Sequence, residues 1–505
     1  MLMKKLNEMA AGLDALWTRR PASFWLPFTL LLAAISIALA NYRMFWHDEL
    51  GTALTTANPG GYPITTRLRG CVDMMPPFYF VITQAVTAPF GVNEISLRLP
   101  SLFGVWLACF SFYWLVRREL SALAAVAGVF ALLSTGIRFF LWEARSYGLL
   151  AGLEGLGVLC WQRCEEPRRR WWLVGLAVSL TLAISVHYYA SLGMVPLGIA
   201  ELWRNWRRRR IDWPVWLAFS VPVLVLAGHM PLIRAGLECY GKDPSTAYTP
   251  SFALLPGMFQ ILLGGLPKLL LLAALTLLPA AAVSRGTMSR PFWILLATLA
   301  VLPVIAVTLG MSIGLLIQPR YVLPTTFGLT GLFIGILWRL WGGAPLRWAS
   351  LAAISFLLLC NSFYNDFERF KQSIYNWGWV KDNVPADGPP VVIAWSHDWF
   401  PAYYYRAALG LPLIVLPVST ELESRYLMED SGSVNHRGFA RFVPGYPAPE
   451  WEAFAAANRR FRILRHQNAP DWLMQHMRAR GIPLVPTAAG GGWELYTVDL
   501  PDGQP

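Results

Sequence analysis

Residues 97–118 read LRLPSLFGVWLACFSFYWLVRR, an apolar run that ends at two arginines. A helix needs roughly 20 apolar residues to cross about 30 Å of hydrocarbon, and this run is long enough. Lys and Arg accumulate at the cytoplasmic ends of such spans, so Arg117-Arg118 marks an inner end. The stretch therefore indicates a membrane-spanning helix, and similar runs occur along most of the chain.

The composition supports a membrane protein. Of the 505 residues, 55% are hydrophobic and 14% are charged, and the mean hydropathy is +0.43. Soluble proteins carry about 25% charged residues, so a soluble enzyme, a disordered chain and a fibrous repeat are excluded. The net charge is +12. The runs that carry much of it, Arg168–Arg170 and Arg207–Arg210, lie between apolar stretches, as membrane anchors do, and do not indicate nucleic-acid binding.

The basic clusters predict which apolar runs span the membrane. The 76–91 run is short and begins at Pro76-Pro77. If it lies on the outer surface, every basic cluster falls inside, whereas if it spans, the first three clusters move outside. We therefore expect about 11 spans, in a range of 11–13, with the N-terminus in the cytoplasm. The predicted spans are residues 24–40, 97–116, 121–140, 146–162, 171–187, 190–203, 213–232, 252–283, 291–312, 321–338 and 347–361.

The composition changes after Phe363. Residues 364–505 contain no apolar run of spanning length, and they alternate short apolar strings with turn formers and amphipathic stretches. This pattern predicts a small α/β domain. We expect a mainly α, polytopic transmembrane domain at 1–363, with an outer loop at 41–96, and a periplasmic α/β domain at 364–505.

Polar residues concentrate in the predicted outer loops. Ionisable groups near a bilayer are costly, and they tend to be functional or paired. Loops that return to one face of a helical bundle can build one site. The residues are Arg43, His47, Asp48, Glu49, Arg67, Arg69, Asp73, Arg98, Arg138, Glu143, Arg145, Tyr147, His187, Tyr188, Lys242, Asp243, Arg320 and Tyr321.

The segment Trp46-His47-Asp48-Glu49 follows the first predicted span directly. Two adjacent carboxylates point in different directions, so one can act as a general base or bind a metal while the other orients it. An ordinary charged helix end is the alternative interpretation.

Three further segments combine Arg, His and Tyr at predicted outer ends of spans. Arginine in residues 142–147 and 318–321 suits phosphate, because the guanidinium group donates two parallel hydrogen bonds. The alternatives are a surface pair of Glu143 with Arg145 and a membrane-interface anchor at Arg320. For residues 187–189 an aromatic-belt role is the more common explanation.

Five motifs in order resemble a known superfamily. They are Trp46–Glu49, Asp73 with Pro76–Tyr79, Ser96–Pro100, Glu143–Tyr147 and Pro319–Pro324. This order is similar to the GT-C glycosyltransferases of the family 39 type, which include the protein O-mannosyltransferases and the transferases that add aminoarabinose to lipid A. Relatives often have His where this chain has Met75. The resemblance covers residues 1–340.

The resemblance implies a GT-C-like bundle with outer juxtamembrane helices, consistent with the charge-based interpretation of residues 76–91. It also implies an inverting transfer of a sugar from a polyprenyl-phosphate donor to an acceptor hydroxyl. The acceptor class, which includes glycolipid, polysaccharide and protein, is not specified, and no nucleic-acid partner is expected. The location implied is a bacterial inner membrane.

The resemblance and the chemistry together assign candidate roles. The catalytic candidates are Asp48, as the base, and Glu49. The donor-phosphate candidates are Arg145, Arg320, Tyr321 and Arg67. The substrate-binding candidates are His47, Asp73, Glu143, Tyr147, His187 and Tyr188.

No cofactor is expected to be required, although Asp48 and Glu143 belong to an oxygen-rich set able to bind a divalent metal. Cys71 and Cys239 both fall in predicted outer loops, where an oxidising compartment allows a disulfide. Two lone cysteines do not by themselves establish that pairing.

Two other functions compete with a transferase. A transporter or flippase of a lipid-linked sugar is the principal alternative. Transporters often show related halves and interrupted helices near the midplane, but this chain shows no obvious halves and its ionisable residues gather at span ends. A scaffold would leave the Asp48-Glu49 and Glu143–Arg145 motifs without a purpose.

Overall fold

The chain folds into two compact units. The computed structural model describes residues 1–240, 250–264, 288–314, 316–371, 376–385, 387–426 and 433–501. Lys242, Asp243 and residues 265–283 of the predicted 252–283 span lie outside these residues. The helical unit comprises Met1–Arg43, Glu94–His229 and Tyr248–Phe370, and the α/β unit comprises Met44–Asn93, Met230–Ala247 and Lys371–Pro505.

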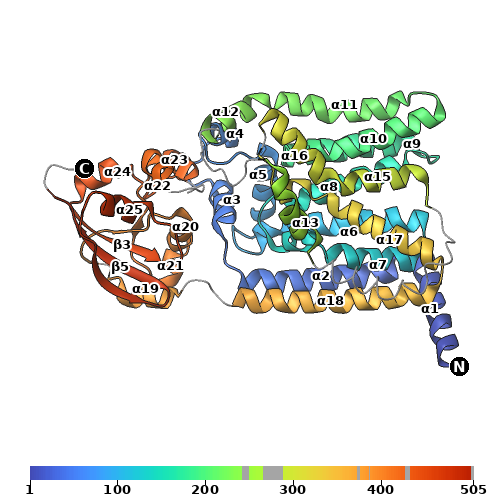
Figure 1. The fold of residues 1–505 in the computed structure, drawn as a ribbon, viewed down its shortest axis with the longest axis horizontal. Coiled ribbons are helices and arrows are strands. Elements are labelled where there is room, and N and C mark those ends of the chain that lie inside the picture. The colour runs from blue at the N-terminus through green and yellow to red at the C-terminus, as the bar shows by residue number, and fades with distance from the viewer. Residues whose placement is uncertain are drawn as a thin grey trace. The chain divides into compact units, whose positions relative to one another are not determined.

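The helical unit is a bundle of mostly apolar helices (Figure 1). Among the described residues, four helices are long and apolar enough to cross a membrane: Ala22–Tyr42, Ser96–Glu119, Arg169–Val186 and Pro345–Lys371. The number rises to seven if each of three bent helix pairs counts as one span. The protein is therefore polytopic, and the count of about 11 spans stays a prediction. The elements are α1 (Leu2–Arg19), α2 (Ala22–Tyr42), η1 (Ser96–Arg98), α6 (Leu99–Glu119), α7 (Ala122–Leu133), η2 (Gly136–Trp142), α8 (Tyr147–Arg163), α9 (Arg169–Val186), α10 (Ala190–Arg208), α11 (Trp213–Gly228), η4 (Phe252–Leu254), α13 (Leu255–Leu263), α15 (Arg290–Ala300), α16 (Leu302–Ile313), η5 (Pro319–Val322), α17 (Thr325–Trp341) and α18 (Pro345–Lys371).

Among the described residues, two of the broken spans lie wholly within the helical unit. The 121–140 run divides into α7 and η2 with a bend of 72°, and the 291–312 run divides into α15 and α16 with a bend of 53°. At the first break the Thr135 side chain accepts the Ile137 N–H, so it caps a new helical segment. At the second, Pro303 in the first turn of α16 cannot donate a hydrogen bond to the preceding helix.

Glycines let α6 and α8 pack closely. A Cβ on Gly104 would overlap the backbone of Gly148 and Leu149, and a Cβ on Gly152 would overlap the backbone of Gly104. Small residues allow membrane helices to approach in this way. The contact fixes the first turns of α8, directly after the predicted site segment 143–147.

The α/β unit contains short helices and a five-stranded sheet of order β2-β1-β3-β5-β4. Strand β1 pairs in parallel with β2 and β3, while β5 pairs antiparallel with β3 and β4. This sheet confirms the small α/β domain expected after Phe363. The elements are α3 (His47–Ala57), α4 (Ile64–Arg69), α5 (Pro77–Thr87), α12 (Met230–Tyr240), α19 (Trp377–Asn383), β1 (Val391–Val392), α20 (Ser396–Tyr404), α21 (Arg406–Leu409), β2 (Ile414–Val415), α22 (Thr420–Tyr426), α23 (Ser433–Phe442), α24 (Trp451–Ala457), β3 (Arg460–His466), α25 (Trp472–Ala479), β4 (Val485–Gly490) and β5 (Trp493–Asp499).

The helices of the predicted outer loop are too short to span a bilayer. Helix α5 has 11 residues. At 1.5 Å per residue it is about 17 Å long, against about 30 Å of hydrocarbon. Pro77 at its first turn suits a helix start, because the missing N–H would have no partner there. The 76–91 run is thus a short helix, as its prolines and the charge pattern predict.

A disulfide joins Cys71 to Cys239 within the α/β unit. Cys71 follows α4 and has a left-handed backbone with φ of 73°, and the Tyr240 hydroxyl donates to its carbonyl at 2.8 Å. The pairing that the sequence left open is therefore present, and it ties the outer loop to α12. The predicted domain boundary at 363/364 falls inside α18, which continues to Lys371.

Candidate functional site

The two adjacent carboxylates at the start of α3 have different surroundings. Glu49 is fully buried, and its Oε2 accepts the backbone N–H of Trp46 at 3.3 Å. It thereby satisfies one of the backbone donors left open at a helix start. The Asp48 side chain remains 21% exposed. Glu49 holds the helix start, and Asp48 is the carboxylate that a substrate can reach.

Three histidines meet beside Asp48 within the α/β unit. The His47 Nδ1 atom lies 3.6 Å from Asp48 Oδ1. The ring of His397, in α20, stacks on His47 with centroids 4.2 Å apart, and His436, in α23, meets it edge-on at 5.5 Å. The His436 Nδ1 atom is 2.6 Å from the Tyr446 hydroxyl. An aromatic wall therefore adjoins the candidate base.

Burial keeps two of these imidazoles uncharged. Burial and, to a smaller extent, the neighbouring His47 lower the pKa of His397 to about 3, and Asp48 opposes this shift. Burial also lowers the pKa of His436 well below its ordinary value, with His47 and His397 adding to the effect. Near neutral pH these two rings pack as neutral aromatic groups.

Sequence reasoning did not find this cluster. His397 and His436 both lie outside the five motifs that predict the site. The scarcity of histidine, seven in the whole chain, was the available signal. Residues far apart in the sequence meet in this region. The Phe45 N–H donates to the Tyr405 hydroxyl at 2.7 Å across a separation of 360 residues.

Arg67 and Asp73 are also buried in the α/β unit. Arg67 donates through Nη1 to the Thr55 carbonyl at 2.5 Å, and burial lowers the pKa of its guanidinium group. Asp73 accepts the Met75 N–H at 3.0 Å, which shapes the turn before α5. Both side chains support the local backbone around α3 and α5, and their predicted substrate roles stay predictions.

In the helical unit, the segment 143–147 connects η2 to α8. The Arg145 N–H donates to the Glu143 carbonyl at 2.8 Å, so the chain turns tightly here. Glu143, Arg145 and Tyr147 are all buried. Arg43 donates to the Trp142 carbonyl at 2.6 Å and so fixes this junction beside the C-terminal end of α2.

Arg145, Tyr147, His187, Arg320 and Tyr321 come together from three places in the sequence. The Arg320 guanidinium lies 5.1 Å from the centre of the Tyr147 ring. The His187 ring lies 5.3 Å from Tyr147 and 5.1 Å from Tyr321. The helical unit thus gathers two cations and three rings that were predicted separately.

Arg145 and Arg320 affect the pKa of His187, which directly follows α9. Burial, together with the charges of Arg145 and Arg320, lowers the pKa of His187 to about 3. The His187 ring is therefore neutral near pH 7, and the arginines supply the positive charge. A group of this kind favours an anionic ligand.

Three further residues from the predicted outer loops, Tyr188, Arg98 and Arg138, have contacts elsewhere in the helical unit. The Tyr188 ring contacts His229 at 5.6 Å. Arg98 is buried and donates to the carbonyls of Ala40 and Arg43 at 3.0 and 2.8 Å. Arg138 pairs with Asp366 at 3.0 Å. Arg98 and Arg138 are accordingly accounted for by the packing of the helical unit.

A divalent metal finds little support. Among the described residues, no group of three or more His, Cys, Asp or Glu side chains has an arrangement able to hold a metal ion. Of the two candidates, Asp48 belongs to the α/β unit and Glu143 to the helical unit. The expectation that no metal is required therefore stays a prediction, and no chemical step is derived through a metal.

Comparison with solved structures identifies the fold. ArnT from Cupriavidus metallidurans, solved bound to undecaprenyl phosphate, matches with a TM-score of 0.58 at 14% sequence identity. The match covers 94% of this chain and 98% of ArnT. The chain has the GT-C fold. ArnT in the apo state gives the same values.

An oligosaccharyltransferase from Archaeoglobus fulgidus, in complex with Zn and sulfate, matches with a TM-score of 0.44 at 11% identity over 94% of this chain and 74% of its own. No protein-family model and no curated protein sequence matches the chain. The GT-C fold agrees with the resemblance carried by the five sequence motifs. At 14% identity the likeness to ArnT establishes the fold, and the roles of individual residues rest on their chemistry.

Proposed function

We propose that the protein is an inverting glycosyltransferase that moves a sugar from a polyprenyl-phosphate donor to an acceptor hydroxyl. One observation carries the proposal: Arg320 lies over the ring of Tyr147, two residues after Arg145, and His187 contacts the same ring, in a chain with the GT-C fold. Two guanidinium groups are well suited to a phosphate. ArnT, of the same fold, was solved with undecaprenyl phosphate bound.

The proposed location is the periplasmic face of a bacterial inner membrane. The basic clusters favour a cytoplasmic N-terminus and an outward α/β unit. Nucleotide sugars are not supplied on that side, so a transferase there needs a donor carried by the bilayer. A polyprenyl phosphate meets this need.

The proposed reaction is a single displacement. The acceptor oxygen forms a bond to the anomeric carbon while the bond from that carbon to the phosphate oxygen breaks. The hydroxyl proton passes to the Asp48 carboxylate, and polyprenyl phosphate leaves with the bonding electrons. Arg145 and Arg320 stabilise the negative charge that develops on the leaving phosphate.

Supporting roles follow from chemistry and position. We propose that Glu49 holds the start of α3 so that Asp48 is presented to the acceptor. The proposed donor-phosphate residues also include Tyr321 and Arg67. The proposed substrate-binding residues are His47, Asp73, Glu143, Tyr147, His187 and Tyr188. No metal takes part in the proposal, so full turnover is expected after exhaustive chelation.

The test uses purified full-length protein and a panel of polyprenyl-phosphate sugars. Free polyprenyl phosphate is measured with and without glycolipid, polysaccharide and peptide acceptors. The proposal expects release with at least one donor, faster when the correct acceptor is present. A parallel assay follows movement of each lipid across proteoliposome membranes. Lipid movement without release from any donor would overturn the transferase and support a flippase.

A further inference from the structure

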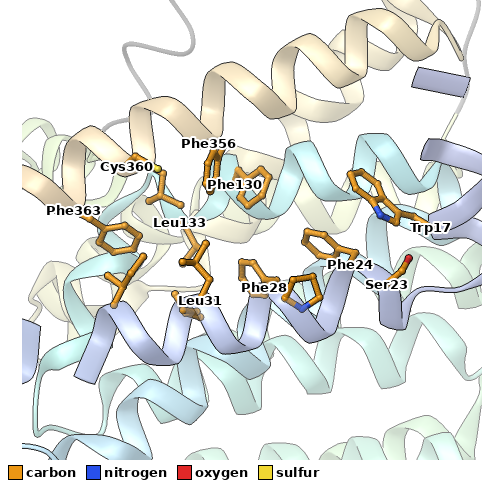
Figure 2. Close-up of a pocket in the computed structure, with 14 residues that line it drawn as sticks. Trp17, Ser23, Phe24, Phe28, Leu31, Phe130, Leu133, Phe356, Cys360 and Phe363 are labelled. Atoms are coloured by element: carbon orange, nitrogen blue, oxygen red, sulfur yellow. The ribbon is translucent and has the colours of Figure 1, made fainter. Parts of the chain in front are cut away.

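An apolar cavity of about 210 Å³ lies between α2, α7 and α18 in the helical unit (Figure 2). Phe24 of α2, Phe130 of α7 and Phe356 of α18 line it, and Trp17 of α1 lies at one end. Ser23 supplies a hydroxyl at that same end, and the remaining lining is almost entirely hydrocarbon and aromatic. Such a cavity suits a hydrocarbon chain.

The cavity is long and narrow. Its α2 lining runs from Ser23 to Ile35, which is about 18 Å at 1.5 Å per residue. The hydrocarbon core of a bilayer is about 30 Å thick, so this length is close to one leaflet. A single acyl chain that enters at the Ser23 end would therefore reach about the middle of the membrane.

A second apolar groove adjoins the cavity. Leu13 of α1 and Ala352 of α18 line it, and it shares Trp17, Phe130 and Phe356 with the cavity. The two spaces meet at those shared rings. A lipid with two chains can therefore place one in each space.

The Ser23 end of the cavity carries positive charge. Arg19 ends α1 and Arg20 follows it, and both side chains are exposed. In the part of the chain that the structure describes, neither forms an ion pair. Arg117 also reaches this end, where it donates to the Thr18 carbonyl at 2.6 Å. The first turn of α2 contains no acidic residue.

We propose that α1, α2, α7 and α18 form a binding site for an anionic glycerophospholipid. One acyl chain fills the cavity, and the lipid phosphate lies against Arg19 and Arg20. Basic residues next to a membrane helix attract anionic lipids electrostatically. The cavity supplies the apolar half of the recognition, and the two exposed arginines supply the selectivity for a charged headgroup.

This site is separate from the proposed donor clamp. Arg43, just beyond the C-terminal end of α2, contacts the Trp142 carbonyl that precedes Arg145. The cavity rim lies at the opposite end of the same 21-residue helix, about 30 Å away. A test of the lipid site is therefore independent of a test of the proposed transferase activity.

Cys360 is a natural reporter for the cavity. It lines the cavity and is exposed, whereas Cys109, Cys160 and Cys164 are buried. The other two cysteines form the disulfide. A small alkylating reagent should therefore modify Cys360 first in the folded protein.

The experiment measures the rate at which N-ethylmaleimide alkylates Cys360 in detergent-solubilised protein. Phosphatidylglycerol, phosphatidylethanolamine with the same acyl chains, and polyprenyl phosphate are titrated separately. We expect phosphatidylglycerol to slow alkylation at least fivefold at a concentration where phosphatidylethanolamine slows it less than twofold.

Paired variants test the headgroup contact. Arg19→Gln with Arg20→Gln should keep the lipid-free alkylation rate and lose the preference for phosphatidylglycerol. Arg209→Gln with Arg210→Gln, which removes two exposed arginines after α10, should keep the preference.

Three outcomes would overturn the proposal. Equal protection by both phospholipids would mean that bulk lipid fills the cavity. Stronger protection by polyprenyl phosphate would assign the cavity to the donor tail. Absence of protection by any lipid would mean that no chain enters it.

Discussion

Asp48 and Glu49 differ in exposure, and this separates their functions at the residue scale. Glu49→Ala should lower the free energy of unfolding by about 1–3 kcal/mol, because the Trp46 N–H loses its buried acceptor. Glu49→Gln keeps an acceptor oxygen and should lose less than half as much. Thermal unfolding of the purified protein measures both. An unchanged melting temperature for Glu49→Ala combined with lost turnover would instead assign Glu49 to the chemistry.

Arg145 is expected to contribute to donor binding. Arg145→Ala should raise the dissociation constant for polyprenyl phosphate about 10- to 100-fold, since a hydrogen bond to a charged group contributes about 1.5–3 kcal/mol. Lipid binding followed by native mass spectrometry measures the change. Arg425→Ala is a matched control, because Arg425 pairs only with an exposed Glu421 among the described residues. Equal affinities for the two variants would remove Arg145 from the clamp.

The histidine cluster predicts a pH dependence of stability. The pKa of His397 is lowered from 6.5 to about 3 in the folded protein. Between these two pH values His397 is protonated in the unfolded chain and neutral in the folded chain. The free energy of unfolding therefore falls as the pH drops from about 6.5 toward 3. His397→Phe lacks this group and should show a smaller loss of melting temperature between pH 7 and pH 5. An identical pH slope would show that His397 is charged in the folded protein.

At this scale the sequence predicts motifs better than roles. The segment Trp46–Glu49 predicts paired carboxylates, but adjacency in the sequence does not predict that Glu49 is fully buried while Asp48 stays partly exposed. The packing of His397 and His436 on His47 depends on long-range folding, because no local pattern links them.

The α6–α8 contact makes a prediction at the scale of elements. Gly104→Ala places a Cβ against the backbone of Gly148, and overpacking of this kind costs about 1–3 kcal/mol. Gly198→Ala in α10 is the control, because nothing lies within 4 Å of its Cβ. Melting temperatures in one detergent should fall for the first variant and hold or rise for the second. Equal melting temperatures would show that the two helices are not in close contact.

Helix positions could be predicted from apolar runs, but helix breaks could not. The run at 121–140 contains no proline, and its break depends on the Thr135 hydroxyl accepting a backbone N–H two residues later. Such local caps compete with a continuous helix, and composition does not decide which prevails. The short α5, by contrast, is preceded by visible prolines and was predictable.

For the whole molecule, charge and composition predict a polytopic protein with a C-terminal α/β region. They do not predict that residues 44–93 and 230–247 belong to the same unit as that region. This membership depends on contacts such as the Cys71–Cys239 disulfide and the Phe45–Tyr405 hydrogen bond. These contacts link segments far apart in the sequence, where periodicity carries no information.

The central claim is that Asp48 is the base of a lipid-linked sugar transfer. The most direct test compares release of polyprenyl phosphate by Asp48→Asn and Asp382→Asn with the same donor and acceptor. Asp382 is an exposed carboxylate in α19 and serves as the matched control. We expect Asp48→Asn to bind donor normally and to lose about 100- to 10,000-fold in kcat, as expected for a lost general base. Turnover by Asp48→Asn equal to that of the control would contradict the claim.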